Sequence, residues 1–258
     1  MILKKLIKVL EERFPKEMAE SWDNVGLLVG DMNWEVKRVM LTLDCTEEAI
    51  EKAIEEGVDL IITHHPLIFS PIKTITTNTI LGKKILKLVE NKIGLYSMHT
   101  NLDSNPEGLN EYFGKKLGFI QGKIIEENIY KDNSYGIGRV YKIENIPLEK
   151  LVGKVKKDLN IDKVRVVTND LNKEIKKVAL VNGSGMSYWR ASKKMGADIL
   201  ITGDVRYHEA LDALEENMDI IDIGHYEGEK IFVDILNEFL YNYVEIINFD
   251  RGPVFKTY

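Results

Sequence analysis

Short apolar segments of strand length alternate with amphipathic segments of helix length along this chain of 258 residues. Residues 36–43 and 59–63 each predict a strand, and the helix between them begins with an N-cap and acidic turn at 44–48 and ends at Gly57. The alternation continues with a helix, a strand and a helix expected over 81–90, 94–97 and 108–117. Strands that alternate with helices predict an α/β fold with a mostly parallel sheet, in which functional sites gather at the carboxyl ends of the strands.

The second half of the chain repeats the first at a constant distance. Residues 36–41 (Val-Lys-Arg-Val-Met-Leu) match residues 175–180 (Ile-Lys-Lys-Val-Ala-Leu), and residues 57–63 match residues 196–202. Both matches have the same offset of 139 residues, without a gap. The shared offset favours an internal duplication over two independent strand-helix units of similar length. We therefore expect two similar three-layer α/β halves, over residues 1–125 and 126–258, with the C-terminal helix able to pack on the first half.

Composition limits the classes of protein to which the chain can belong. Its hydrophobic content of 44% can fill a core, and its net charge of -6 argues against general binding to nucleic acid or an anionic membrane. The single cysteine, Cys45, excludes an internal disulfide and a cysteine-based zinc site. No apolar run approaches the roughly 20 residues that span a bilayer, and the first residues do not form a signal-peptide core. A cytoplasmic protein is the expectation.

The histidines of the first half follow predicted strands. His64 and His65 come directly after an apolar strand, and Pro66 favours a departure from regular strand that lets both rings face one site. The next strand is followed by His99 and, four residues later, by the carboxylate of Asp103. Because the carboxyl ends of parallel strands meet at one edge of a sheet, these side chains are expected to lie close together.

The second half adds two more histidines near strand exits. His208 lies on a helix that follows the turn at 203–204, and His225 follows the strand expected over 219–223. His225 and Glu229 are four residues apart where a helix begins, so they share one face of its first turn. All five histidines of the chain thus lie at a predicted strand exit, or within one helical turn of one.

Histidine and carboxylate side chains at neighbouring strand exits are typical ligands of divalent metal ions. A structural hydrogen-bonding role would explain any one of these histidines alone, but five in this distribution favour a metal site. Two ions about 3.5 to 4 Å apart, bridged by a carboxylate, would use the whole set of candidate ligands, which are His64, His65, Asp103, His225 and Glu229. Nitrogen and oxygen ligands without sulfur fit Zn, Fe, Mn, Ni or Co, so the metal is not identified by the sequence.

At these residues the sequence resembles the GTP cyclohydrolase I type 2 homologue family, also called the Nif-three-like proteins. The segments that carry the resemblance span nearly the whole chain and include Trp22-Asp23-Asn24, Thr63-His64-His65-Pro66, His99-Thr100-Asn101-Leu102-Asp103, Gly183-Ser184-Gly185 and Gly224-His225 through Glu229. The resemblance implies a duplicated α/β fold, a dinuclear metal centre in a cleft between the halves, and a toroidal homohexamer. It also implies that the five candidate ligands hold the metal ions. Tyr226-Glu227-Gly228 departs from the small residues often found before the final glutamate, although the spacing from histidine to glutamate is kept.

The expected function is that of a metal-dependent hydrolase acting on a nucleotide or a related small molecule through a metal-activated water. Either His99 or His208 could transfer protons, because an unperturbed histidine titrates near neutral pH. Asp23 and Asp204 are candidates for contacts with the metal ligands or the substrate. The alternative is that they only cap a helix or lie in a solvated loop. The family label does not settle the substrate.

A non-catalytic role is the alternative from another class of function. The chain could store or deliver metal, or form a ring-shaped scaffold that binds a partner or nucleic acid. A basic lining of such a ring would draw on lysines of the predicted helices, which are Lys83, Lys84, Lys87, Lys154, Lys156 and Lys157. Ordinary solvated helix faces explain the same lysines, and the acidic total supports that reading.

Overall fold

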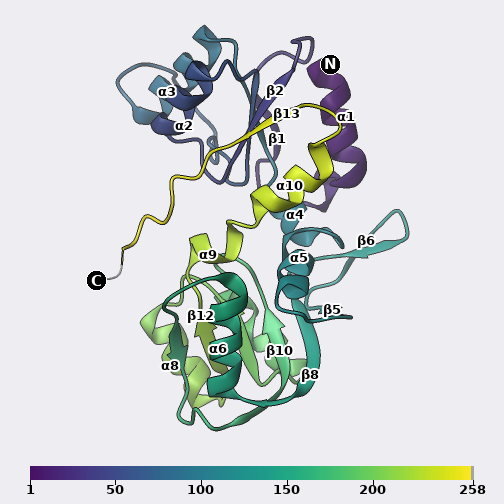
Figure 1. Cartoon of the computed structure of the whole chain (residues 1–258), viewed down its shortest axis with the longest axis vertical. Helices are drawn as coiled ribbons and strands as arrows, with labels where there is room; N and C mark the ends of the chain where they lie inside the picture. The colour runs from purple at the N-terminus through teal and green to yellow at the C-terminus, as the bar shows by residue number, and fades with distance from the viewer. Residues whose placement is uncertain (257–258) are drawn as a thin grey trace. The chain divides into compact units, whose positions relative to one another are not determined.

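The structure is a computed structural model that describes residues 1–256, and it divides into two compact units. The first unit comprises Met1–Leu102 and Phe232–Gly252, and the second comprises Asp103–Ile231 and, among the described residues, 253–256 (Figure 1). These units differ in their boundaries from the halves expected over 1–125 and 126–258. The reason is that the end of the chain returns to the first unit and adds a strand to its sheet.

The sheet of the first unit has five strands. Their order is β1 (Gly26–Val29), β4 (Gly94–Ser97), β3 (Leu60–Thr63), β2 (Arg38–Thr42) and β13 (Glu245–Asn248). All neighbours pair in parallel except β1, which runs antiparallel to β4. Three of the central strands are fully or almost fully buried, as expected for a parallel sheet covered on both faces.

Helices cover both faces of this sheet. On one face Met40, Ile61 and Leu95 pack against α2 (Glu47–Glu55) and α3 (Ile80–Glu90). On the other face lie α1 (Leu3–Arg13) and α10 (Phe232–Leu240), whose neighbouring ends are joined by an edge-to-face contact between Phe14 and Phe239 (Figure 1). The remaining elements are a short helical turn, η1 (Lys16–Met18), and α4 (Thr100–Ser104), which follows β4.

The second unit is built on a six-stranded sheet. The strand order is β5 (Lys123–Ile124), β8 (Arg139–Pro147), β10 (Glu174–Leu180), β11 (Ile199–Thr202), β12 (Asp219–Asp222) and β9 (Arg165–Val167). Only β10, β11 and β12 pair in parallel, whereas β5, β8 and β9 are joined antiparallel. The expectation of a mostly parallel sheet is therefore wrong for this unit, because its outer strands return in the opposite direction, an arrangement common at the edges of parallel sheets.

Helices also lie on both faces of the second sheet. Trp189 of α7 (Trp189–Lys194) and Ala213 of α8 (Tyr207–Glu215) belong to the core on one face. On the other face α5 (Leu109–Lys116) comes so close to Tyr141 that only glycine fits at position 114. The unit is completed by α6 (Leu148–Leu159), the turn η2 (Met186–Tyr188), α9 (His225–Glu229) and a separate hairpin of β6 (Asn128–Tyr130) and β7 (Asn133–Tyr135).

The strand pairs β2–β3 and β10–β11 carry the same side-chain hydrogen bonds in both units. One carboxylate oxygen of Asp59 accepts hydrogen bonds from the backbone N–H groups of Lys37 and Arg38, at 2.8 and 3.0 Å. In the second unit, one oxygen of Asp198 accepts from Lys176 and Lys177, both at 2.8 Å. Each of these residues lies 139 positions after its counterpart, and β3 and β11 occupy residues 60–63 and 199–202. The sequence repeat thus corresponds to a repeated local structure.

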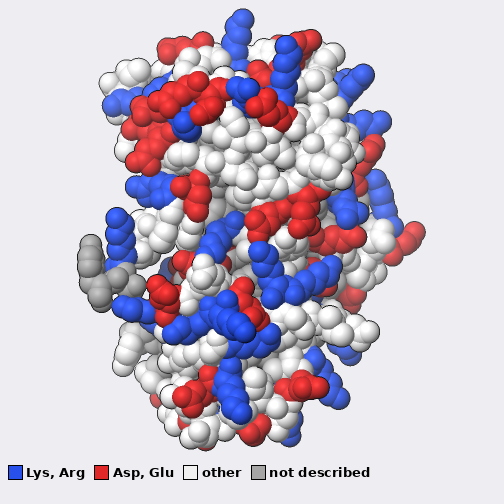
Figure 2. All heavy atoms as spheres, in the orientation of Figure 1, with Lys and Arg blue, Asp and Glu red and all other residues white. Residues whose placement is uncertain are grey.

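Charged side chains are mixed in sign on the face of the molecule in Figure 2, where red and blue groups lie among one another. Two of the lysines considered for a basic lining are ion-paired: Lys87 with Glu51 at 3.0 Å and Lys154 with Asp158 at 2.6 Å. Among the described residues, no helix is long and apolar enough to span a membrane.

Candidate metal-binding site

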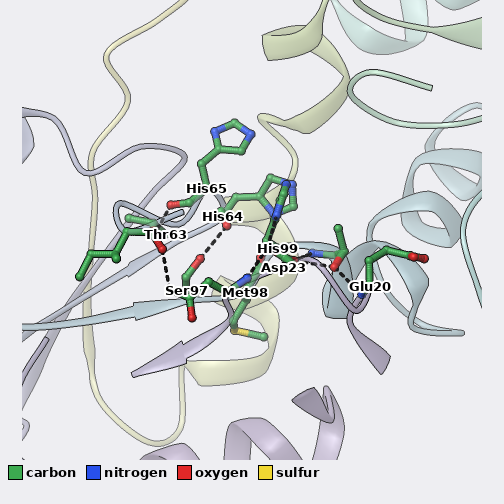
Figure 3. Close-up of polar contacts among 11 residues, drawn as sticks. Glu20, Asp23, Thr63, His64, His65, Ser97, Met98 and His99 are labelled. Carbon is green, nitrogen blue, oxygen red and sulfur yellow. Dashed lines mark hydrogen bonds and ion pairs between the residues drawn. The ribbon is translucent and has the colours of Figure 1, made fainter. Parts of the chain in front are cut away.

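Three histidines of the first unit come together where β3 and β4 end. His64 and His65 follow β3, and His99 follows β4, which is the parallel neighbour of β3. Their potential ligand atoms all lie within 4.8 Å of one another, and the rings of His64 and His99 are 5.1 Å apart (Figure 3). The expected convergence is therefore present for the three histidines, but Asp103, which was expected to lie with them, does not belong to this group among the described residues.

The chain leaves regular strand geometry directly after Thr63, as Pro66 suggested. The hydroxyl of Thr63 donates to the carbonyl of His65 at 2.8 Å, and the hydroxyl of Ser97 donates to the carbonyl of His64 at 2.9 Å (Figure 3). These bonds hold the backbone in a turn, so that the two adjacent rings lie only 5.0 Å apart instead of on opposite faces of the sheet.

Each of the three histidines has its Nδ1 atom next to an oxygen acceptor. The Nδ1 of His64 is 2.8 Å from the carbonyl of Met98, that of His65 is 3.0 Å from Asp44, and that of His99 is 2.9 Å from Asp23. A neutral ring that donates from Nδ1 carries its lone pair on Nε2, which is the tautomer that binds metal through Nε2. Outer oxygen acceptors of this kind accompany metal-binding histidines in most known sites.

The segment Trp22-Asp23-Asn24 fastens the two histidine loops. One oxygen of the buried Asp23 lies beside His99, and the other accepts from the backbone N–H of Thr100 at 3.0 Å and from its hydroxyl at 2.5 Å. The side-chain amide of Asn24 donates to the carbonyl of Ile68 at 2.5 Å, in the loop that follows the two adjacent histidines. Burial by itself would raise the pKa of Asp23, but the hydrogen bonds from His99 and Thr100 outweigh it and lower the pKa to about 2.

The second unit contributes a histidine and a buried glutamate from one helical turn. His225 and Glu229 begin and end α9, and the Nε2 of His225 is 2.9 Å from a carboxylate oxygen of Glu229. The Nδ1 of His225 is 2.7 Å from Asp204, so this ring too has an outer oxygen partner. This separation is that of a hydrogen bond or ion pair between the two side chains, and two donors this close can also bind one metal ion.

The segment Gly183-Ser184-Gly185 packs directly on Glu229. Gly183 has a φ of +60°, and a Cβ atom at this position would lie 2.1 Å from a carboxylate oxygen of Glu229. The N–H of Gly185 donates to the hydroxyl of Thr202, which in turn donates to the carbonyl of Gly183, at 2.9 and 3.2 Å. Glycine is therefore required at position 183 by the carboxylate of Glu229, and at position 185 by Val181 and Thr202.

The structure also places the other residues considered from the sequence. Asp103 lies on α4, four residues after His99, and its backbone carbonyl accepts from Asn110 at 3.1 Å. His208 is an exposed residue of α8 whose ring lies against Tyr207, and neither group of potential metal ligands includes it among the described residues. The two candidate proton-transfer residues therefore differ, since only His99 lies with other histidines.

Two polar residues of the sites were not singled out from the sequence. Asp44 was considered part of a helix N-cap, but the cap of α2 is Thr46, and Asp44 lies beside His65. Asn182 follows β10, and among the described residues neither polar atom of its buried amide has a hydrogen-bond partner. Each lies two residues after the end of a strand, a position that would have identified both as candidates.

The donor set fits a divalent metal ion of the borderline or hard type. Its members are imidazole nitrogens and carboxylate oxygens, in a geometry that already fixes the histidine tautomers. Cys45 does not add a sulfur ligand: burial raises the pKa of its thiol to about 12, so the thiolate form needed for coordination is disfavoured.

Comparison with known sequences identifies relatives that all belong to one family. A family model described as Duf34/NIF3 (NGG1p interacting factor 3) matches residues 1–253. The "GTP cyclohydrolase 1 type 2 homolog" of Clostridium perfringens is 44% identical over 230 residues, which cover 89% of this chain and 87% of the relative. The protein with the same description from Clostridium acetobutylicum is 40% identical and covers 92% of this chain and 88% of its own length. The resemblance drawn from the sequence motifs is confirmed.

Solved structures share the fold. The Staphylococcus aureus hypothetical protein SA1388 superposes with a TM-score of 0.86 at 33% identity, covering 96% of both chains. Reduced HcgD from Methanocaldococcus jannaschii gives a TM-score of 0.83 at 33% identity, covering 96% of this chain and 97% of that one. A Bacillus cereus protein related to NIF3 gives a TM-score of 0.90 at 24% identity, covering 100% and 99%. The mixed α/β fold with two main sheets is thus that of known NIF3 structures.

Proposed function

Since the chain belongs to the Duf34/NIF3 (NGG1p interacting factor 3) family, we propose that it is a dinuclear metal-dependent hydrolase of a nucleotide or a related small molecule. One observation carries this proposal. Four histidines next to strand exits each have Nδ1 beside an oxygen acceptor, and three of them share one cluster. In all four, an acceptor beside Nδ1 favours the tautomer that leaves the lone pair on Nε2. This is the arrangement found in metal-binding histidines, and a purely structural role does not require it.

The proposed ligands are the five residues taken from the sequence, namely His64, His65, Asp103, His225 and Glu229. When bound, two divalent ions would supply a water molecule of lowered pKa and polarise an oxygen atom of the substrate. Asp44 and Asp204 orient the rings of His65 and His225 through Nδ1. The Gly183 loop holds the carboxylate of Glu229 in its place on α9.

We assign proton transfer to His99 instead of His208. His99 lies with His64 and His65, and the buried carboxylate of Asp23 faces its Nδ1. A carboxylate in this position stabilises the imidazolium that forms when the ring accepts a proton at Nε2. Asp23 therefore acts as a positioning residue for His99.

Metal content of purified variants tests the ligand assignment. After loading with Mn²⁺ or Zn²⁺ and removal of excess metal, we expect about two ions per chain by elemental analysis. His65→Ala should lower this number, whereas His208→Ala, which removes an exposed histidine of α8, should leave it unchanged. Unchanged metal content in His65→Ala would show that the assignment is wrong.

A substrate screen tests the reaction class. The metal-loaded protein is incubated with GTP, other nucleotides and generic phosphoesters, and the products are separated by chromatography. Turnover that disappears in the chelator-treated protein and in His65→Ala would support a hydrolase. Full metal content without turnover of any of these compounds would instead favour metal storage or delivery, and rapid exchange of the bound metal would then be expected.

The finer features of the proposal concern ancestry and assembly. We propose that the two units descend from an internal duplication, supported by the equivalent contacts of Asp59 and Asp198. A toroidal homohexamer is proposed from the family resemblance, and light scattering of the purified protein would give its mass. A nucleic-acid-binding ring is less supported, because Lys87 and Lys154 are already ion-paired. DNA binding that falls steeply with added salt would be the evidence for such a ring.

A further inference from the structure

Two exposed aromatic residues of the first unit lie beside the histidine cluster. Trp22 is 57% exposed and Phe69 is 54% exposed, and their ring centroids are 5.9 Å apart. The ring of Trp22 also lies 6.1 Å from that of His99, in an edge-to-face arrangement. An aromatic surface therefore runs from the buried His64 through His99 to Trp22 and Phe69 at the exterior.

Polar contacts hold the backbone next to these rings. Glu20 donates its N–H to the hydroxyl of Thr100 at 2.9 Å, and Asp23, which directly follows Trp22, is bonded to His99 and Thr100. Ile68, which directly precedes Phe69, has its carbonyl bonded to Asn24. The backbone is thus held on both sides of Trp22 and on one side of Phe69, and Asp23 joins the position of Trp22 to that of His99.

From this geometry we propose that Trp22 and Phe69 bind the planar heteroaromatic ring of the substrate, such as a nucleobase. A tryptophan that keeps more than half of its surface in water offers a π-face for stacking, and stacking accepts any planar base. Because the backbone is already fixed, little conformational entropy is lost when the ring binds. The inference rests on the proposed function, since it assumes that the rest of the substrate reaches the histidine cluster.

Binding of two ligands that differ only in the base tests the proposal. Guanosine 5′-monophosphate and ribose 5-phosphate are titrated into the metal-loaded protein, and each dissociation constant is measured by calorimetry without turnover. We expect the nucleotide to bind wild type about 5- to 100-fold more tightly than the sugar phosphate, the range typical of one stacked base. Trp22→Ala should remove most of this preference, Phe69→Ala part of it, and Trp22→Phe should restore much of it.

The controls separate this inference from the function on which it rests. Tyr241→Ala removes another exposed aromatic side chain of the same unit and should keep the full preference for the nucleotide. Metal content is measured in every variant and should equal that of wild type. A preference that survives in Trp22→Ala, or that is absent from wild type, would overturn the base-binding role, whereas loss of the metal assignment would be seen separately in His65→Ala. A change of particle mass in Trp22→Ala would also overturn it, because the rings would then belong to a contact between copies of the chain.

Discussion

At the scale of single residues, Asp23 joins the two loops that carry the histidines. Its two carboxylate oxygens contact His99 on one side and the start of α4 on the other, and the following residue, Asn24, reaches the loop after His65. The side chain is inaccessible to solvent, so these contacts are made in place of water. A buried carboxylate with several hydrogen-bond donors is stabilised in its ionised form.

We expect Asp23→Asn to make the stability of the protein less sensitive to acid. The pKa of Asp23 is about 2 in the folded chain, against 3.8 ordinarily, so its ionisation favours the folded state above about pH 4. This contribution, about 2 kcal/mol, is lost as the pH falls through 2. Urea unfolding of wild type and variant should therefore differ most near neutral pH and converge towards pH 2. A difference that stays constant over this range would contradict the argument, and Asp31→Asn, in an exposed turn, serves as the comparison.

Gly183 is the residue whose substitution should disturb Glu229 most directly. Alanine at this position would adopt an unfavourable positive φ, and its Cβ would meet the carboxylate at 2.1 Å. We expect Gly183→Ala to destabilise the fold by about 1 to 3 kcal/mol and to lower the metal content. Thermal unfolding and elemental analysis measure the two effects.

The matched control is Gly153→Ala on α6. A Cβ atom there meets nothing within 4 Å, and alanine is the better helix former, so this variant should be as stable as wild type or more stable, by up to about 1 kcal/mol. If Gly183→Ala behaved like Gly153→Ala in both measurements, the packing of the loop on Glu229 would have no functional meaning.

At the scale of elements, Asp59 and Asp198 each join two neighbouring parallel strands. Each side chain accepts hydrogen bonds from two backbone N–H groups, at the start of β2 for Asp59 and within β10 for Asp198. The backbone N–H of each aspartate donates to the carbonyl of Arg38 or Lys177. A single residue thus adds three hydrogen bonds between the two strands, just before their regular pairing begins.

We expect Asp59→Ala and Asp198→Ala to destabilise the protein by similar amounts, about 1 kcal/mol each, because each removes two hydrogen bonds that water can replace only in part. The asparagine variants should lose less, since the amide oxygen can still accept. Urea unfolding of the four variants measures these differences. Strongly unequal costs for the two aspartates would indicate that the local structures are not equivalent energetically.

The elements that local sequence predicts well are those whose signal lies within a few residues. The strand over 94–97 was predicted with its observed bounds, and the helix expected over 81–90 corresponds to α3, which ends at Glu90. By contrast, β13 was missed, because its pairing with β2 joins residues about 200 positions apart and has no local signal. The antiparallel direction of β8 and β9 likewise has no local signal, because it depends on the path of the whole chain.

The same distinction applies to the site. The histidines were found because they follow strands, and the His225–Glu229 pair because helical periodicity places i and i+4 residues together. Among the carboxylates beside the histidines, Asp23 and Asp204 had been candidates, but the sequence could not say which histidine each contacts, and Asp44 was missed, since it lies 21 residues from His65. Such contacts depend on which strand exits become neighbours, a property of the folded sheet and not of any short segment.

At the scale of the whole molecule, the proposed ligands come from both compact units: His64 and His65 from the first, and Asp103, His225 and Glu229 from the second. Metal binding should therefore stabilise the chain as a whole. At a free metal concentration of 100 times Kd, a single site adds about 2.7 kcal/mol to the free energy of unfolding.

The stabilisation of the fold by bound metal can distinguish one metal centre, with ligands from both units, from two independent metal sites. We expect Mn²⁺ or Zn²⁺ to raise the unfolding temperature of chelator-treated wild type, and expect His65→Ala and Glu229→Ala each to lose most of that rise, although the two residues belong to different units. His208→Ala should keep the full rise, since His208 is in neither group of ligands among the described residues. If the ions were held separately, each ligand variant would retain the stabilisation from the other site, and the double variant would lose the sum of the two single losses. Differential scanning calorimetry with and without metal, on the three single variants and the double variant, decides between these outcomes. With a shared centre, the second ligand substitution causes almost no further loss of the metal-dependent rise in unfolding temperature.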